Sequence, residues 1–464
     1  MSINRKYHAI STGIFVMTVS YISPMYASED IDATHNTTLA EGHEYETVKP
    51  TDTGEGVTYK GWTFQGDLRA GYVLYDYSND PRHPNPDINM GHLDSKGFYT
   101  SAKLSLVTPK YNGVYVKVTG AGITDFGFND PLYETRTFAF GESGEPFAIL
   151  TDAYLAYDDN GQKILVGAEE IDTPLIESDD YYLLANSFQL SYYKNTMIEN
   201  MMFGGAYFYK MAGVWDSGAD GAHYHTMADA SYVDPRDKAN VSDGGIYTLF
   251  AQYSDEVHNF QAWNYYGPDL YNMFLLQYDY TGKQKGISYE AGIQFINFSQ
   301  VGALADHDYT TIDYSIYSIR LDAELNQGFD VSVAAMFFTD GEGPGATLGA
   351  WGGYPYFATG MIFSFFDPGS LQNANIYKLQ IGYNLEELGL DGLWGGIRYT
   401  YFDLDPAYSI SSFTGIGENK MADIGAKLTY KHSSGLNLTV TYEHADLDQQ
   451  PGIHGFRLIA GYKF

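Results

Sequence analysis

The chain has 464 residues, no cysteine and a formal net charge of −32 at pH 7. The lack of cysteine excludes disulfide bonds and thiolate chemistry, and the acidic charge argues against nucleic acid as a partner. With 44% hydrophobic residues and a mean hydropathy of −0.27, the chain is too polar for a bundle of transmembrane helices. It nevertheless contains 43 Tyr, 27 Phe and 50 Gly, a mixture expected where only alternate strand residues meet lipid.

The first 27 residues are typical of an export signal. Arg5 and Lys6 precede an uncharged stretch from Ala9 to Ile22, and small residues around Ala27 fit a cleavage site. Residues 28–61 are acidic and polar and lack strand alternation, so we expect them to form a flexible extension. The sequence therefore predicts three parts: a signal peptide (1–27), this extension (28–61) and one barrel domain (62–464).

From Trp62 onward, apolar and polar residues alternate in segments of about ten residues, the length of a transmembrane strand. In the first segment, Leu68 and Ala70 share one face opposite Asp67 and Arg69. The same pattern recurs in the segments that begin near residues 98, 114, 317 and 424. Because the side-chain period of a strand is two, each segment presents one face to lipid and the other to water.

The last nine residues carry the same alternation, and they end on an aromatic residue. Phe456, Leu458, Ala460, Tyr462 and Phe464 share one face. A chain that ends on such a strand must close its sheet, because a free edge in hydrocarbon leaves backbone groups unpaired. At about 22 to 25 residues per strand, the sequence predicts an all-β fold: a transmembrane antiparallel β-barrel of about 18 strands, or of 16.

A barrel of this width encloses a water-filled bore unless loops fold into it. Four long polar stretches are available for this purpose, at residues 123–146, 171–185, 215–245 and 339–354. Residues 343–366 are uncharged and long enough for a membrane helix, but Pro344 and Pro355 argue against one. We predict a loop there, followed by a strand at residues 356–366.

Residues 150–213 resemble the OprD-like porins and the related major outer-membrane porins. The resemblance is carried by the segments at 153–155, 166–175, 178–180 and 185–188, whose sequences are AYL, VGAEEIDTPL, SDD and ANSF. They are similar to the family's strand ending in a GRQ-type motif, its acidic D-T-P-L turn, its D-D-x-R segment and its P-N-T-F segment. Residues 66–69 (GDLR) also look like the family's first strand. The resemblance implies an 18-stranded barrel, usually trimeric, that passes small solutes by diffusion.

The chain departs from the family pattern at positions that bear on selectivity. Ala168 stands where the GRQ-type motif has Arg, Tyr181 and Tyr182 follow the acidic pair where the family has Arg, and Ala185 replaces Pro. Family members specific for carboxylated solutes use basic residues near the constriction. Two such positions are not basic here, so the resemblance does not carry carboxylate specificity over to this chain.

The charged residues of the predicted strands fall on the face opposite the apolar one, and we predict that they line the pore. One interpretation is avoidance, because a charge facing lipid costs about 2 to 4 kcal/mol at mid-membrane. The other is a partial basic ladder facing carboxylates, which favours small zwitterions and ions. The predicted pore-lining residues are Asp67, Arg69, Lys103, Lys117, Arg320, Asp322, Glu324, Arg398, Lys427 and Arg457.

A second group of carboxylates lies in the segment that resembles the porins. If this loop bends into the lumen, as the resemblance implies, the group favours cations at the constriction. Exposed loop acids far from the constriction are the alternative. The predicted constriction residues are Glu169, Glu170, Asp172, Asp179 and Asp180.

The sequence offers little support for a metal site or for catalysis. His223 and His225, near three aspartates, have the residue types of a transition-metal site, but a solvated loop also explains them. We expect no cofactor, although Ca²⁺ at the acidic loops is an alternative. Neither a G-x-S-x-G nor an H-E-x-x-H motif occurs.

The expected function is passive diffusion of small hydrophilic solutes and ions through an outer-membrane porin with weak cation preference. A channel selective for amino acids or other small zwitterionic or organic-acid nutrients is the alternative, and a barrel hydrolase is a third. We expect outer-membrane lipid and lipopolysaccharide as partners, and assembly as a homotrimer.

Overall fold

The structure is a computed structural model of the chain. It describes residues 57–77, 94–130, 140, 145–178, 183–213, 221–231, 241–306, 313–325, 328–341, 351–358, 371–409, 417–449 and 452–464. The predicted signal peptide and most of the predicted extension lie outside these ranges.

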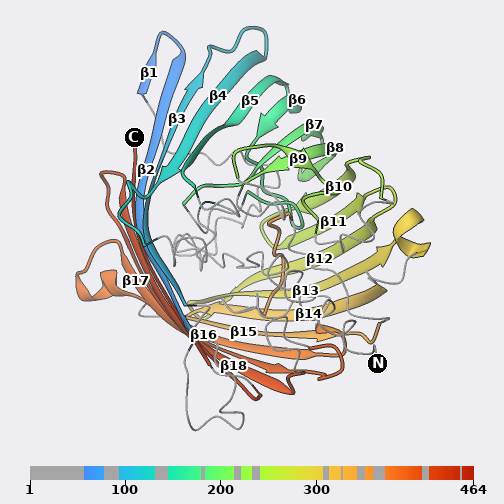
Figure 1. The fold of residues 1–464 in the computed structure, drawn as a ribbon, viewed down its shortest axis with the longest axis vertical. Helices are drawn as coiled ribbons and strands as arrows, with labels where there is room; N and C mark the ends of the chain where they lie inside the picture. Colours follow the sequence, from blue (N-terminus) through green and yellow to red (C-terminus); the bar gives the residue numbers. More distant parts are fainter. Residues whose placement is uncertain are drawn as a thin grey trace, which may run out of the picture.

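The described residues form one antiparallel sheet, and 18 of its 20 strands close into a barrel (Figure 1). Each strand of the barrel pairs with its neighbours in the chain, and β20 pairs with β2. The predicted fold class and strand number are therefore confirmed. The barrel strands are β2 (Trp62–Tyr77), β3 (Ser95–Val107), β4 (Val114–Thr124), β5 (Phe147–Asp159), β6 (Gln162–Glu169), β7 (Ser187–Asn195), β8 (Met201–Ala212), β10 (Ile246–Ser254), β11 (His258–Tyr266), β12 (Tyr271–Gln284), β13 (Ile287–Gln300), β14 (Asp313–Glu324), β15 (Phe329–Phe338), β16 (Asn375–Asn384), β17 (Leu393–Asp403), β18 (Lys420–Lys431), β19 (Leu436–Leu447) and β20 (Ile453–Lys463).

Two further strands are short and lie outside the barrel ring. β1 (Val57–Tyr59) pairs with β2, and β9 (His225–Thr226) pairs with β8. β1 lies inside the segment predicted as a flexible extension, so regular structure begins five residues before the predicted boundary at Trp62. The pairing explains this, because the first residues of β2 offer an edge on which Val57–Tyr59 can form a hairpin.

The regular helices of the described chain are two short 3₁₀ helices, η3 (Gly302–Asp306) and η6 (Leu385–Leu388). No helix in the described ranges has the length and apolar content that a membrane crossing requires.

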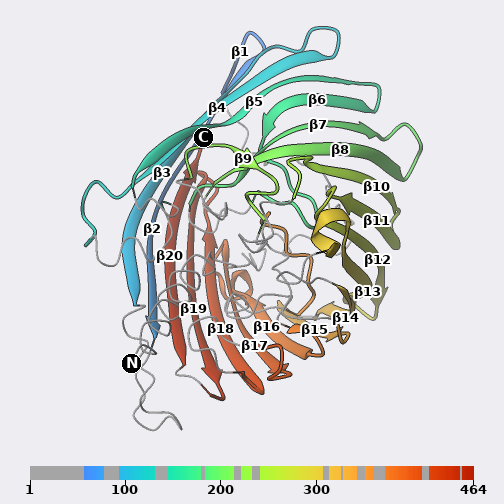
Figure 2. The same ribbon diagram turned by 45° about the vertical axis from the view of Figure 1, so that its right-hand side comes forward.

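The seam between β2 and β20 is joined at the C-terminal residue. The Gly66 amide donates to the Phe464 carbonyl (2.8 Å), and the Phe464 amide donates to the Gly66 carbonyl (3.0 Å). Figure 2 shows the two strands side by side. The pairing of the last residue satisfies backbone groups that a free edge would leave exposed to lipid.

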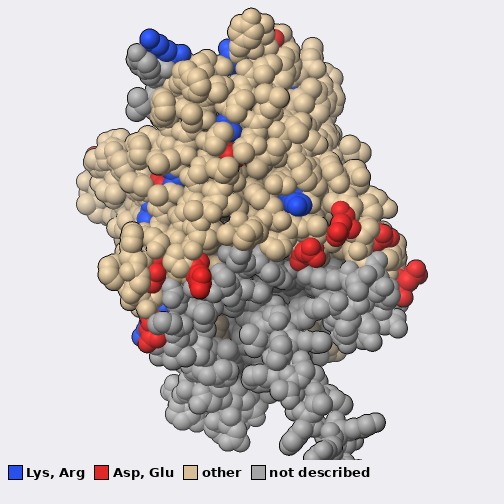
Figure 3. Space-filling model, turned by 45° about the horizontal axis from the view of Figure 1, so that its top comes forward, with Lys and Arg blue, Asp and Glu red and all other residues tan. Residues whose placement is uncertain are grey.

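The predicted alternation is visible in the exposure of the strand residues. Outward side chains are apolar and exposed, such as Leu104 and Ile397 at 61% each, whereas inward residues such as Lys103 and Arg398 are buried. Figure 3 shows the consequence on one face of the molecule, where few charged side chains lie on the described part of the outer surface.

The two ends of the barrel differ in the length of their connections. At one end, short connections join consecutive strands, and among them are the two-residue turns Asn160–Gly161 and Lys285–Gly286, where both central residues have positive φ (50°, 73°, 52° and 86°). This is the type I′ geometry that matches the twist of a hairpin. The long connections lie at the other end. In outer-membrane barrels the short turns are periplasmic and the long loops are extracellular. By this rule, the end with the short connections is the periplasmic end and the end with the long connections is the extracellular end.

The strand predicted at residues 356–366 is wrong in the part that the structure describes. Residues 356–358, the start of the strand predicted at 356–366, form no strand but a bend inside the barrel. Phe357 and Ala358 are buried against inner-wall side chains instead of pairing with a neighbour. Residues 359–366 lie outside the described ranges.

Candidate functional site

Three segments far apart in the sequence meet inside the barrel. They are residues 170–186, 221–231 and 351–358, as far as these are described, and we call them the inward unit. Ile176 and Gly352 form a β-bridge, and the Glu177 amide donates to the Trp351 carbonyl (2.9 Å). The Trp351 indole donates to the Met227 carbonyl (3.0 Å). The inward unit therefore has its own internal hydrogen bonds.

On one side, the inward unit is fixed to strands β3 and β5. The Ser101 hydroxyl donates to the Leu183 carbonyl (2.9 Å), and the Glu170 amide donates to the Asp152 carboxylate (3.2 Å). The Lys103 ammonium group pairs with the Glu170 carboxylate. All of these groups are buried.

On the other side, the inward unit is fixed to strands β11, β13 and β14. The Tyr265 hydroxyl donates to Thr173 Oγ1 (3.0 Å), and the Gln294 amide donates to the Pro355 carbonyl (2.7 Å). The guanidinium of Arg320 lies over the Phe357 ring, 4.6 Å from its centroid. These contacts connect β3 to β14, so the inward unit bridges the bore.

The inward unit also contacts β5 and β7 through Tyr224. The Tyr224 hydroxyl donates to the Leu150 carbonyl (2.8 Å) and lies 2.7 Å from the Ser187 hydroxyl. Burial raises the pKa of Tyr224 to about 12, so the hydroxyl remains a proton donor at neutral pH.

A first charge cluster lines strands β3 to β6 and contains equal numbers of lysines and carboxylates. It consists of the Lys103–Glu170 pair, the Lys117–Asp152 pair (3.1 Å) and the Lys163–Glu169 pair (3.7 Å). Lys163 also lies over the Tyr192 ring, 5.3 Å from its centroid. The predicted constriction residues Glu169 and Glu170 are thus each paired with a lysine and buried.

The other predicted constriction residues have different positions. Asp172 is half-buried and accepts a hydrogen bond from the Ser178 amide (3.3 Å). Asp179 and Asp180 lie outside the described residues. The structure therefore does not gather the five predicted constriction carboxylates into one described group.

A second charge cluster surrounds Arg320, and carboxylates outnumber the cation. The Arg320 guanidinium pairs with Asp279 (2.9 Å), Glu290 and Asp322 (3.2 Å). Gln277 also donates to Asp279 (2.8 Å). The side chains of Arg320 and Asp322 are 11% and 20% exposed, so the cluster keeps some contact with the solvent of the lumen.

A third cluster covers strands β17 to β20. Arg398 pairs with Asp423 (3.1 Å) and with Glu443. Lys427 and Arg457 flank Thr441 in the strand register and are buried on the same inner face. This cluster contains three basic residues and two carboxylates.

The remaining predicted pore-lining residues lie on β2 and at the end of β14. Arg69 pairs with Asp67 on the same strand (3.0 Å). Glu324 is the last residue of β14 and is half-buried. The structure thus distributes the predicted pore-lining charges around the bore in several small groups.

Sequence reasoning missed six charged residues that complete these clusters. The sequence pattern did not assign Asp152 to the inner face, because a β-bulge at Thr119/Gly120 shifts the alternation of inward and outward residues in its strand pair. The pattern did not assign Asp279 either, because Met273 and Leu275 lie on the same inner face. The first half of β12 therefore shows no alternation between apolar and polar residues. Inward-phase carboxylates and lysines in the other strands were the available signal. The six residues are Asp152, Lys163, Asp279, Glu290, Asp423 and Glu443.

The histidine motif does not form a metal site in the described part of the chain. His225 belongs to β9, where it pairs with Met211, and His223 precedes it. No group of His, Asp and Glu in the described ranges has the arrangement of a metal site. The flanking Asp216 and Asp220 lie outside those ranges.

Comparison with known proteins finds structures of the same fold at low sequence identity. No protein-family model matches the chain, and no curated protein matches it in sequence. OccK9 (OpdG) of Pseudomonas aeruginosa superimposes with a TM-score of 0.70 at 14% identity, covering 87% of this chain and 98% of that one. A BenF-like porin from Pseudomonas fluorescens Pf-5 gives 0.70 at 17% identity, with the same coverage. Acinetobacter baumannii OccAB3 gives 0.67 at 14% identity and covers 87% of this chain and 99% of that one.

The chain has the fold of an OprD-like outer-membrane porin. Its outward apolar face and its closed strand ring are those of an integral outer-membrane barrel. The resemblance found in residues 150–213 is thereby supported at the level of fold, and the inward segment that it predicts is present at residues 170–178 and 183–186.

Proposed function

We propose that this chain is an outer-membrane porin through which small hydrophilic solutes and ions diffuse passively, with a weak preference for cations. The observation that carries the proposal is the inner face of the closed barrel, where charged side chains from many strands surround a bore bridged by the inward unit. No chemical step is needed for transport, and solute flow follows the concentration gradient.

The cation preference is argued from the cluster around Arg320. One guanidinium faces the carboxylates of Asp279, Glu290 and Asp322, which gives the cluster a formal excess of negative charge. The β3–β6 cluster is balanced, and the β17–β20 cluster has one excess cation. A local excess of carboxylates at a partly hydrated site raises the local concentration of cations. Opposing basic groups elsewhere in the bore keep the preference weak.

Reversal potentials in planar bilayers test this proposal. The purified protein is reconstituted, and the zero-current potential is measured across a tenfold KCl gradient. A potential of the sign for K⁺ over Cl⁻ supports the proposal, and anion preference contradicts it. Absence of any conductance, together with hydrolysis of added lipid or peptide, would instead favour a barrel hydrolase.

A substrate-selective channel for amino acids or small organic acids is the second candidate. The inward unit crosses the bore and is fixed on both sides, an arrangement suited to sorting solutes by shape. One similar structure, OpdK of Pseudomonas aeruginosa, is described with vanillate (TM-score 0.66, 14% identity). Liposome swelling with sugars, amino acids and organic acids separates the candidates. A general porin admits solutes in order of size, whereas a selective channel admits one chemical class ahead of smaller solutes.

We further propose that the chain assembles as a homotrimer after removal of a signal peptide at about residue 27. Mass measurement of the membrane-extracted protein tests both points. A mature monomer that begins near Ser28, and a complex of three times its mass, are the expected results.

A further inference from the structure

Strands β20 and β1 lie end to end along one edge of β2. β1 pairs with residues 62–64 of β2, and β20 together with Phe464 pairs with residues 66–77. The opposite edge of β2 is occupied by β3. Figure 1 shows β1 and the C-terminus together at this end of β2. The chain that precedes Val57 therefore meets Phe464 and has to leave the barrel wall at this junction.

The junction lies at the periplasmic end of the barrel. β1 and β2 are joined by the two-residue turn Lys60–Gly61, with φ of 51° and 83°, which belongs to the short connections of this end. Trp62, Phe64 and Phe464 point outward here and are exposed, as expected for the aromatic girdle at a membrane interface. The preceding chain can leave toward the lumen, the lipid or the periplasm.

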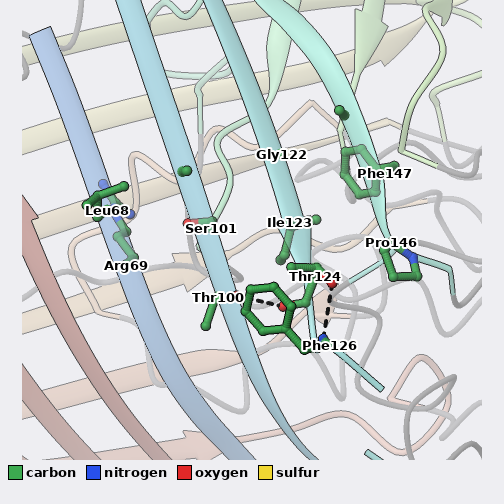
Figure 4. Close-up of a pocket in the computed structure, with 12 residues that line it drawn as sticks. Leu68, Arg69, Thr100, Ser101, Gly122, Ile123, Thr124, Phe126, Pro146 and Phe147 are labelled. Carbon is green, nitrogen blue, oxygen red and sulfur yellow. Dashed lines mark hydrogen bonds between the residues drawn. The ribbon is translucent and has the colours of Figure 1, made fainter. Parts of the chain in front are cut away.

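The lipid side does not suit the segment that precedes β1. Residues 28–56 contain eight Asp and Glu and one Lys, which gives a formal charge of −7. The outer wall beside the junction is apolar, as in the depression across β2 to β5 (Figure 4), where Leu68, Ala102 and Ala148 point outward. Carboxylates placed against this wall would lose their hydration without gaining a partner.

The lumen beside the junction carries the opposite charge. The inner face of β16 to β20, which we call the basic wall, has six basic side chains and the two carboxylates of Asp423 and Glu443, a formal charge of +4. The β3–β6 cluster, in contrast, is balanced. The six basic residues are Lys378, Arg398, Lys427, Lys431, Arg457 and Lys463.

The middle of the basic wall is covered. Lys427 and Arg457 are 7% and 6% exposed, although they project into the bore of an 18-stranded barrel. Such a bore is filled with water unless another segment folds into it. The wall contacts of the inward unit described above lie on strands β3 to β15. The burial of these two residues therefore calls for a further segment beside β18 and β20.

Residues 28–56 are long enough to reach this place from the junction. Arg457 precedes Phe464 by seven residues along β20, a distance of about 23 Å at 3.3 Å per residue. A flexible chain of 29 residues has a root-mean-square span of about 30 Å. The segment can therefore follow β20 as far as Arg457 without being fully extended.

We infer that residues 28–56 enter the periplasmic mouth of the barrel and lie along the basic wall, with their carboxylates paired with its lysines and arginines. The segment narrows the bore and neutralises the excess positive charge on that side. The inference rests on the closed barrel and on the assignment of its two ends, and not on the solute or ion preference proposed above.

Zero-length cross-linking of the unmodified protein tests the inference. A water-soluble carbodiimide joins a carboxylate to a lysine amine that it contacts, and peptide mass spectrometry identifies the two residues. We expect links from residues 28–56 to Lys427 or Lys463. The exposed Lys110–Asp158 pair (3.0 Å) is the internal control, because its link shows that the reagent has acted.

Two cross-linking results would overturn the inference. If residues 28–56 link only to exposed lysines of the periplasmic turns, such as Lys110 and Lys285, or form no link while the control pair does, the segment lies outside the bore. If Lys427 links to a carboxylate of a loop between strands in place of this segment, that loop covers the basic wall.

Ion selectivity provides a second measurement. Replacement of the eight Asp and Glu of residues 28–56 by Asn and Gln in the full-length chain should uncover the basic wall. The K⁺/Cl⁻ permeability ratio should then fall by about fivefold or more, the effect of one unit charge at 4 Å in water. Heat-modifiable migration in electrophoresis verifies that the variant is folded.

The control is the variant Asp159→Asn/Asp391→Asn, which neutralises two exposed carboxylates in periplasmic turns. It should keep the wild-type ratio, because salt screens charges that lie more than about 8 to 10 Å from the permeating ion. A ratio that stays unchanged when residues 28–56 are neutralised would also overturn the inference. Anion preference of the wild type would contradict the proposed cation preference and would leave the cross-linking result as it stands.

Discussion

The guanidinium of Arg320 joins the barrel wall to the inward unit. On one side it pairs with three carboxylates of strands β12 to β14, and on the other it lies 4.6 Å from the centroid of the Phe357 ring. One side chain therefore sets both the local charge of the bore and the position of residues 351–358. The two roles respond differently to substitution, because a lysine keeps the charge but not the planar face.

Arg320→Gln should increase the preference for cations. It removes the cation and leaves the carboxylates of Asp279, Glu290 and Asp322. A unit charge at 4 Å is worth about 1 kcal/mol in water, or about a fivefold change in the local concentration of a monovalent ion, upward for cations and downward for anions. The K⁺/Cl⁻ permeability ratio, from reversal potentials, should rise by about fivefold or more. The Arg320→Lys variant should keep the wild-type ratio, and an equal rise in both variants would show that packing rather than charge controls selectivity.

Lys103→Met should destabilise the barrel, because it leaves the buried Glu170 carboxylate without its cation. Breaking a buried ion pair from one side typically costs about 3 to 5 kcal/mol. Urea unfolding from lipid vesicles, followed by tryptophan fluorescence, measures the loss. Lys110→Met is the control, because the Lys110–Asp158 pair (3.0 Å) is exposed and such pairs contribute about 0 to 1 kcal/mol.

The double variant Lys103→Met/Glu170→Leu completes this experiment. It removes both charges and should recover most of the stability lost in Lys103→Met alone. If the double variant is as unstable as the single one, the cost comes from lost packing and the buried charge is not its cause.

The strand alternation of the sequence was sufficient for the fold but not for the clusters. Lys103 and Arg320 could be assigned to the inner face from their phase, because a period of two fixes the face of every residue in a strand. The partners of these residues could not be assigned. Glu170 lies 67 residues from Lys103, and Asp279 lies 41 residues from Arg320, so each pair depends on strand register and loop path. Neither is encoded in a local pattern.

The inward unit was predicted only in part for a related reason. The resemblance implied that the segment after Ala168 enters the lumen, and Leu175, Ile176 and Leu183 are indeed buried there. Apolar residues inside a loop that is otherwise polar are a further signal of burial, which did not enter the prediction. The partner segment at 351–358 gave no such signal, because its aromatics also fit a lipid-facing strand. The tertiary contacts of this segment, among them those of Phe357 with Arg320, of Pro355 with Gln294 and of Gly352 with Ile176, separate the two interpretations.

Gly352→Val should open the inward unit. Gly352 has φ +83°, and a Cβ atom there would lie 2.3 Å from the Glu177 carbonyl oxygen. The substitution therefore opposes both the backbone conformation and the bridge to Ile176, at a cost of about 1 to 3 kcal/mol. Single-channel conductance should increase as the two segments separate.

The control for this variant is Gly389→Val, at a glycine with φ +81° whose Cβ would meet no atom within 4 Å. It carries the same backbone strain in a periplasmic turn without the clash. Conductance that rises equally in both variants would contradict a role for the bridge between Ile176 and Gly352.

Gly66→Val should weaken the seam that closes the barrel. A Cβ atom at position 66 would lie 2.2 Å from Cζ of Phe464, so the terminal ring must move away from β2. Its movement strains the two hydrogen bonds between Gly66 and Phe464 (2.8 and 3.0 Å), and overpacking of this kind costs about 1 to 3 kcal/mol. The urea midpoint of unfolding from vesicles should fall accordingly.

Gly120→Val provides the comparison, because Gly120 also faces lipid and its Cβ would meet no atom within 4 Å. Should both variants lose the same stability, the cost would belong to replacing a strand glycine, and the ring of Phe464 would have no special part in closing the barrel.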